Sequence, residues 1–397
     1  MQKSRHSPIT IALAFFAGAL LPNAAAFSIQ PQLGPYPVSV SNIAIQTSRD
    51  DALAPQSGTK RRLMLSILQP QMDTFACHNS SYTPYMPART ASVMKTQEPA
   101  GIPLSPIADL DFNALEVEYC ALSSSLVSLA EPRLPILLFQ PGYQNSRFSY
   151  QLNLASIASS GYTVISMDST FETPIIEFPD GSTVVNNTGI SEDGLGPNDS
   201  LPVRVADYSS VIDALENGEL QVPGLELSSK STGEEGKIGG IGVFGHSIGG
   251  AAALSAASSD PRIAAAIDWD GQIFSSQINI SIPVPAFLFG RETPLPGHVE
   301  GWEFAWDNLL KGEKVWVAVN GTQHLSFTDL PIVLDVEGLR KEYRENVEAV
   351  GGVIAPERQR EILWRGSVGW FDSVLKGTGE DLFHNRINDY PDVRFVK

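Results

Sequence analysis

The sequence has few of the residues that proteins use to hold metals. Its 397 residues include two cysteines and six histidines, and neither H-E-x-x-H nor a cysteine–histidine cluster with zinc spacing occurs. We therefore expect no metal centre, and the chemistry inferred below needs no organic cofactor. Cys77 and Cys120 are expected to form a disulfide in an oxidising compartment, and two buried free thiols are the alternative.

Basic residues are also scarce. Lys and Arg together number 27 against 44 Asp and Glu, which gives a formal net charge of −17. Because phosphate recognition needs clustered positive charge, this balance argues against nucleic acid and anionic membranes as partners. A neutral or zwitterionic small molecule is more compatible with it. The hydrophobic content of 43% is ordinary for a globular protein and excludes a largely disordered or fibrous chain.

The longest apolar run lies near the start of the chain. Residues 9–21 follow Lys3 and Arg5 and precede Ala24, Ala25 and Ala26, which is the order of a secretory signal peptide cleaved after Ala26. An uncleaved anchor is the alternative, but the run is shorter than the ~20 residues of a spanning helix. We expect residues 1–26 to be removed and residues 27–397 to be secreted as one catalytic domain. Five N-x-S/T acceptor triplets fit a glycosylated surface: Asn79, Asn186, Asn198, Asn279 and Asn320.

From residue 133 onward, apolar runs of strand length alternate with helical periodicity. This pattern predicts an α/β fold with a mostly parallel central sheet and helices on both faces. The expected strands span 135–140, 163–168, 238–245, 263–269, 284–289 and 314–319, and the expected helices span 147–159, 203–216, 248–257, 300–310 and 357–375.

The segments outside this pattern are less regular. Residues 27–60, with β-prone pieces at 38–40 and 42–47, are expected to form a leading arm or hairpin, and residues 62–68 a strand. Residues 73–107 show no clear periodicity. Residues 171–201 are polar and are expected to form an exposed insertion.

The most informative motif is Gly245-His246-Ser247-Ile248-Gly249, between a β-prone run and a helix rich in small residues. A serine on such a strand-to-helix turn is presented as a nucleophile, and the glycines remove side chains that would clash there. Residues 240–245 also match the dinucleotide fingerprint G-x-G-x-x-G, but these glycines lie inside the predicted strand rather than after it. The context therefore predicts that Ser247 is a catalytic nucleophile.

A serine nucleophile needs a base, which is usually a histidine held by a carboxylate. His324 follows the last predicted strand on the loop 320–327, which satisfies the chain order Ser, acid, His of the α/β-hydrolases. His298 and His384 are its competitors. His246 lies inside the turn, where a packing or positioning role is expected.

Three carboxylates compete for the role of the acid. Asp268 and Asp270 follow one predicted strand and Glu292 follows the next, each near a carboxyl end where an open α/β sheet binds its ligands. Position along the chain does not choose among them.

Several pieces of the sequence resemble the plasma-type platelet-activating factor acetylhydrolases and their fungal and bacterial relatives. The resemblance covers roughly residues 130–330 and is carried by the segments 138–143, 245–249, 260–271 and 323–329. It implies that the acid is the carboxylate just before the glycine of Ile267-Asp-Trp-Asp-Gly271, which is Asp270. The sequence departs from these relatives at Gln140-Pro141, where a Ser-His or similar pair is frequent.

The oxyanion hole is expected to use two backbone N–H groups, those of Tyr143 and Ile248. By resemblance, the substrate is a phospholipid with a short or oxidised acyl group at its second position. A general esterase or polyester hydrolase of the cutinase or dienelactone type is the alternative, with Glu292 as the more natural acid. A non-catalytic binding protein with a hydrolase-like fold is the rival from another class.

Aromatic residues at helical spacing occur at 302–306 and 364–370. We expect core packing for them, and transient contact with a lipid surface is the alternative. No sequence pattern indicates an oligomeric state.

Overall fold

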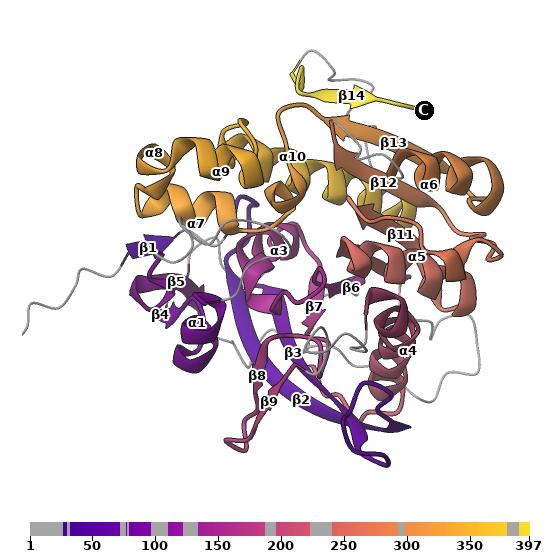
Figure 1. The fold of residues 1–397 in the computed structure, drawn as a ribbon, viewed down its shortest axis with the longest axis horizontal. Helices are drawn as coiled ribbons and strands as arrows, with labels where there is room; N and C mark the ends of the chain where they lie inside the picture. The colour runs from indigo at the N-terminus through magenta and orange to yellow at the C-terminus, as the bar shows by residue number, and fades with distance from the viewer. Residues whose placement is uncertain are drawn as a thin grey trace, which may run out of the picture.

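The computed structural model describes residues 27–29, 32–71, 77, 79–96, 110–121, 134–186, 196–222, 240–292, 298–378 and 389–397. A large mixed sheet organises this part of the chain. Its strands are β2 (Val38–Asp50), β3 (Lys60–Pro70), β6 (Ile136–Gln140), β7 (Thr163–Met167), β10 (Ile241–His246), β11 (Ile263–Trp269), β12 (Ala286–Arg291), β13 (Lys314–Val319) and β14 (Val393–Phe395). They lie in the order β14-β13-β12-β11-β10-β6-β7-β3-β2, from the top of Figure 1 to its lower edge.

The centre of this sheet is parallel. Strands β7, β6, β10, β11, β12 and β13 are parallel neighbours, whereas β3 and β2 at one edge and β14 at the other are antiparallel. The carboxyl ends of the parallel strands therefore meet along one edge of the sheet, where open α/β folds place their sites.

Helices cover both faces of the sheet. One face carries η3 (Arg147–Tyr150), α3 (Gln151–Ala158), α7 (Leu330–Val336), α8 (Leu339–Glu342), α9 (Arg344–Gly351), α10 (Pro356–Phe371) and η8 (Asp372–Lys376). The other carries α4 (Pro197–Glu216), α5 (Ile248–Ser259), α6 (His298–Phe304) and η6 (Ala305–Leu309). In Figure 1, α4 and α5 lie to the right of the central strands and α7, α8 and α9 to the upper left.

The central strands are apolar along their whole length because both of their faces are covered. Phe244 of β10 packs against Phe371 of α10, with ring centroids 5.7 Å apart, while the neighbouring Val243 lies in the core on the α5 side. This two-sided burial explains why the sequence reads as continuous apolar runs rather than as alternation.

The predicted strands and helices of the central sheet are confirmed. Strands β11 and β13 match the expected ranges, and β6, β7 and β12 differ at their ends by one or two residues. Of the expected strand 238–245, which corresponds to β10, residues 238–239 lie outside the described residues. Helix α4 begins at Pro197, six residues before the expected start, with Pro202 inside its second turn.

The expectations for the irregular segments were partly wrong. Residues 38–50 form one long strand that pairs with β3, so the expected hairpin and the expected strand at 62–68 are confirmed. The segment 171–201 is not a uniformly exposed insertion, since β8 (Ile175–Glu177) and β9 (Thr183–Val185) form a hairpin in which Ile176 and Phe178 are buried against Met64 of β3. The structure of these segments depends on contacts with residues that are distant in sequence, and the local polarity of the segments does not indicate such contacts.

A small second sheet lies beside the main one. Its strands are β1 (Phe27–Ile29), β5 (Leu115–Cys120) and β4 (Ser80–Pro84), in that order, with η1 (Phe112–Ala114) and α1 (Ala88–Met94) nearby. The predicted disulfide joins Cys77 to Cys120 at a Cα–Cα distance of 5.6 Å. It ties the segment before β4 to the end of β5.

Four of the five aromatic residues at helical spacing are buried or pack against the core, as expected, whereas Phe304 is 38% exposed. Trp302 is 3% exposed and stands edge-on to Trp316, with ring centroids 5.6 Å apart, and Trp370 is also buried. Among the described helices, none combines the length and apolar character needed to cross a membrane.

Candidate active site

Ser247 occupies a strained turn between β10 and α5. Its backbone has φ 57° and ψ −126°, a conformation that L residues rarely adopt. The turn closes only because glycines flank it: a Cβ on Gly245 would lie 2.3 Å from the carbonyl carbon of Gly249, and one on Gly249 would lie 2.1 Å from the oxygen of Gln140. The predicted strand, serine and helix are therefore present, with the serine at the helix N-terminus.

Asp270 and His324 meet beside this turn. Asp270 follows β11 with φ 51°, and its Oδ2 lies 2.5 Å from Nδ1 of His324, the first residue of η7 (His324–Phe327) after β13. Since the carboxylate accepts, Nδ1 of His324 donates, which leaves the lone pair of a neutral ring on Nε2. The Oδ1 atom of Asp270 accepts from the backbone N–H of Arg291 at 3.2 Å, and the Arg291 guanidinium lies 3.5 Å from Oδ2.

Ser247 lies directly against the loop that carries Asp270. The N–H of Ser247 donates to the oxygen of Trp269 at 2.8 Å. The backbone carbonyl oxygen of Ser247 would lie 2.3 Å from a Cβ built on Gly271, so the residue after Asp270 must be a glycine. The predicted acid and base thus meet after β11 and β13, and the turn of the predicted nucleophile after β10 adjoins the loop of the acid.

The two alternative acids are engaged elsewhere. Asp268 is fully buried and accepts from the N–H of Gly271 at 2.7 Å, and burial raises its pKa well above the ordinary value of 3.8. Glu292 accepts from the N–H of Gly321 at 3.1 Å, at the start of the loop that carries His324. Of the three carboxylates, Asp270 is the one whose geometry matches an acid that orients a histidine.

A cavity of about 140 Å³ lies behind Asp270, on the side of β12 and β13. It is lined by Asp270, Gly290, Arg291, Glu292, Trp302, Glu303, Trp316, Ala318, Arg394 and Val396.

The loop after β6 carries the expected oxyanion donor, Tyr143. Arg204 of α4 donates to the carbonyl oxygens of Pro141 and Gly142, at 2.8 and 3.2 Å. Because the N–H and C=O of a trans peptide point in opposite directions, the bond to the Gly142 oxygen turns the N–H of Tyr143 away from Arg204. The second expected donor, Ile248, is the first residue of α5, where backbone N–H groups lack helical partners.

Residues that the sequence analysis missed hold this loop in place. Arg204 and Glu172 form a fully buried ion pair, and Glu172 also accepts from the N–H of Gln144 at 3.4 Å. The hydroxyl of Tyr150 accepts from the N–H of Gly142 at 3.0 Å. An Arg inside an expected helix was the one signal in the sequence, and its burial and its partners appear only in the structure.

His246 is buried and is not placed as a base. Burial lowers its pKa well below the ordinary value of 6.5, and Nδ1 and Nε2 are hydrogen-bonded to Tyr150 and to the oxygen of His324. Its ring, Asp270 and His324 place ligand atoms within 4.8 Å of one another, a spacing that a metal ion could bridge. A metal would have to displace the hydrogen bonds of both rings, so the donor set fits a proton-transfer site better than a metal site.

The remaining predicted residues fall in several places. Asn79, Asn198 and Asn279 are exposed, and Asn186 and Asn320 are partly buried. His384, the competing histidine, and the segment 1–26 lie outside the described residues, as does the side chain of His298.

The sheet order, the two layers of helices and the turn at Ser247 define the class: the chain has the α/β-hydrolase fold. A solved ferulic acid esterase from Streptomyces cinnamoneus is 26% identical, with a TM-score of 0.73, and the match covers 94% of this chain and 100% of that one. The predicted fold class is confirmed by this likeness.

A curated relative points to a particular group of esterases. It is described as "Probable 1-alkyl-2-acetylglycerophosphocholine esterase" from Arthroderma benhamiae and is 29% identical over 276 residues, which is 66% of this chain and 66% of the relative. No family model matches the chain. The resemblance to the platelet-activating factor acetylhydrolases, inferred from the motifs, is confirmed: the chain is similar to carboxylic ester hydrolases in sequence and in fold.

Proposed function

We propose that this chain is a serine carboxylic-ester hydrolase that removes a short acyl group from a phospholipid. The observation that carries the proposal is the 2.5 Å contact between His324 Nδ1 and Asp270 Oδ2, beside the strained turn of Ser247. The relative named as a 1-alkyl-2-acetylglycerophosphocholine esterase supports the substrate class.

In the proposed reaction, Ser247 Oγ attacks the ester carbonyl and His324 Nε2 takes its proton. Asp270 holds the His324 ring with its Nδ1 proton toward the carboxylate and stabilises the imidazolium. The N–H groups of Tyr143 and Ile248 donate to the oxyanion of the tetrahedral intermediate. His324 then protonates the leaving alcohol, and a water activated by the same ring hydrolyses the acyl-enzyme.

A second candidate substrate is an ester of an aromatic acid. It is favoured by the ferulic acid esterase, because that likeness extends over the whole of the neighbour's chain.

In the same proposal the protein is secreted. The segment 1–26, the disulfide and the exposed acceptor triplets support that location.

The test compares three substrate types on the purified protein and on Ser247→Ala. These are a 2-acetyl phospholipid, a series of p-nitrophenyl esters of rising chain length, and methyl ferulate. We expect the phospholipid to give the highest kcat/KM, and Ser247→Ala to lower kcat by roughly 10⁴-fold or more.

Each other outcome has a clear meaning. A preference for methyl ferulate would favour the aromatic-ester candidate. Hydrolysis of simple esters alone would favour a general esterase. An inactive wild-type protein that a serine-directed phosphonate fails to label at Ser247 would contradict the enzyme proposal and favour a binding protein.

A further inference from the structure

A network of hydrogen bonds joins two loops: the loop after β6, which carries the proposed oxyanion donor Tyr143, and the loop that carries His324. It begins at the N–H of Gly142, which donates to the Tyr150 hydroxyl at 3.0 Å. The hydroxyl lies 2.8 Å from Nδ1 of His246, and Nε2 of His246 lies 3.0 Å from the backbone oxygen of His324. Gly142 and His324, which are distant in sequence, are thus connected through the side chains of Tyr150 and His246.

The donor and the acceptor of each hydrogen bond in this network can be assigned from the groups at its two ends. The oxygen of His324 is a carbonyl and accepts, so Nε2 of His246 carries the proton. Burial lowers the pKa of His246 well below its ordinary value, so the ring is neutral and Nδ1 offers a lone pair. Tyr150 therefore donates its hydroxyl proton to His246 and uses an oxygen lone pair for the N–H of Gly142.

The surroundings hold both rings in one orientation. His246 and Tyr150 are both fully buried. The His246 ring packs 4.4 Å from the ring of His324 and stacks 6.0 Å from Phe327, measured between centroids, and Phe139 lies 4.9 Å from Tyr150. Neither side chain can turn without leaving a buried polar group without a partner, which is costly.

Resting on the proposed function, we infer that His246 and Tyr150 are positioning residues that set the distance between the oxyanion hole and the base. Neither side chain is hydrogen-bonded to the side chain of Ser247 or of His324, although the His246 ring packs against the His324 ring. They hold the backbone of Gly142, which precedes the donor Tyr143, and the backbone of His324. The bonds they support matter most when the oxyanion forms, so their loss lowers kcat more than it raises KM.

The first test is Tyr150→Phe, which keeps the ring and removes the hydroxyl. Active sites are counted with a fluorescent phosphonate, so that kcat refers only to folded, reactive protein. We expect kcat per labelled site to fall about 10- to 100-fold and KM to stay within about threefold. Tyr162→Phe is the matched control, because this buried tyrosine donates to Asp372 on the far side of α3 and should leave kcat unchanged.

The second test exchanges His246 for two residues of similar size. In His246→Gln the amide oxygen replaces Nδ1 as acceptor and the amide N–H replaces Nε2–H as donor, whereas His246→Leu provides neither. We expect the Gln variant to retain at least tenfold more kcat per labelled site than the Leu variant. This pair keeps the inference testable if Tyr150→Phe does not fold.

A third measurement does not depend on activity. The ¹⁵N chemical shifts of the His246 ring at pH 7 should report a proton on Nε2 and none on Nδ1. A proton on Nδ1, or Tyr150→Phe with wild-type kcat per labelled site, would overturn the inference while leaving the proposed function intact. A wild-type protein that hydrolyses no ester contradicts the proposed function itself, and the inference with it.

Discussion

Ser247 and Asp270 both have left-handed backbone conformations, with φ values of 57° and 51°. Among the described residues, four non-glycine residues have positive φ. Besides Ser247 and Asp270, one of them is Gln144, which follows Tyr143, the proposed oxyanion donor. Such conformations cost of order 1–3 kcal/mol each and persist where packing enforces them. Three of the four lie in the candidate active site, so the backbone strain is concentrated where the orientation of side chains and N–H groups matters most.

The choice of Asp270 over Asp268 can be tested by exchanging each carboxylate for an amide. Asp270→Asn should lower kcat by about 10⁴-fold, because an amide holds His324 in the wrong tautomer. Asp268→Asn is the matched control. Burial raises the pKa of Asp268 well above its ordinary value, and the amide oxygen of the variant can still accept from the N–H of Gly271.

We expect Asp268→Asn to stay within about threefold of the wild-type kcat, because it keeps the hydrogen bond to Gly271 and leaves the Asp270–His324 contact in place. The measurement is kcat at neutral pH for both variants, corrected for the labelled fraction. A large loss in Asp268→Asn together with little loss in Asp270→Asn would reverse the assignment.

At the scale of elements, the site is assembled where α4, α5 and the loop after β6 meet. Arg204 from α4 holds two carbonyl groups of that loop, and Gly249 of α5 leaves room for the oxygen of Gln140. The loop is therefore fixed from both sides by helices that are themselves packed on the sheet.

Removing Arg204 should damage both stability and catalysis. Arg204→Met leaves Glu172 as a buried, unpaired carboxylate, which costs about 3–5 kcal/mol of unfolding free energy. It also frees the peptide between Gly142 and Tyr143 to rotate. Urea unfolding should show the first effect and kcat per labelled site the second.

The double variant Arg204→Met, Glu172→Gln separates the two effects. Removing the unpaired charge should recover about half or more of the lost stability, since replacing both members of a buried pair is far less costly than breaking it. The kcat should stay low, because the carbonyl groups of the loop still lack their donor. Recovery of kcat along with stability would show that Arg204 acts on folding alone.

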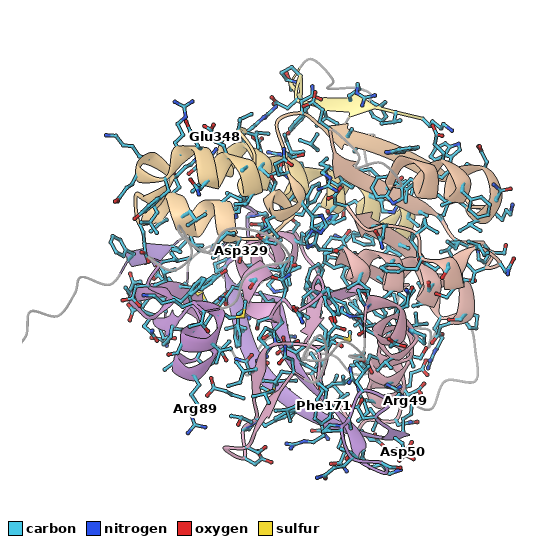
Figure 2. The ribbon with its side chains drawn as sticks, viewed as in Figure 1. Arg49, Asp50, Arg89, Phe171, Asp329 and Glu348 are labelled. Atoms are coloured by element: carbon cyan, nitrogen blue, oxygen red, sulfur yellow. A yellow bond between two sulfur atoms is a disulfide. The ribbon has the colours of Figure 1, made fainter. Side chains whose placement is uncertain are left out.

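At the scale of the whole molecule, Asp329 joins parts of the chain that are distant in sequence. Its carboxylate accepts from the N–H groups of Leu152 and Asn153 at the start of α3, and from Tyr85 beside the small sheet. It lies at the start of α7, just beyond the His324 loop, and Figure 2 labels it in the middle of the molecule. One buried side chain thus holds together the small sheet, α3 and the loop of the base.

Asp329 should make stability depend on pH in an unusual direction. Burial raises the pKa of Asp329 from 3.8 to about 6, so ionisation is more costly in the folded state than in the unfolded one. Its contribution to stability is therefore fully present below about pH 4 and is lost as the pH rises through 6. The full change is on the order of 3 kcal/mol.

The measurement compares wild type with Asp329→Asn, which does not titrate there. The wild-type free energy of unfolding minus that of the variant should fall between pH 4 and pH 7, because other titrating groups cancel in the difference. A flat difference, or a ¹³C carboxyl titration of the native protein with a pKa near 4, would contradict this prediction.

The sequence predicted the central sheet and the hairpin of β2 and β3 well and the segment 171–201 poorly. The strand–serine–helix turn, β11 and β13 were placed correctly, since their patterns are local and both faces of the strands are buried. The hairpin of β8 and β9 was read as an exposed insertion. Its burial depends on Met64, more than 100 residues earlier, and no local pattern reports such a contact.

By itself the sequence determined the turn at Ser247, because the glycines that permit a positive φ are its immediate neighbours. It also indicated that His324, the proposed base, follows β13, because chain order follows strand order in this fold. Only the tertiary structure decided which carboxylate meets His324. Asp268 and Asp270 are two residues apart, and the left-handed turn at Asp270 directs one to the ring and leaves the other buried. The bonds from Arg204 to Gly142, from Tyr150 to His246 and from His246 to His324 likewise required the fold, since each joins residues at least 62 positions apart.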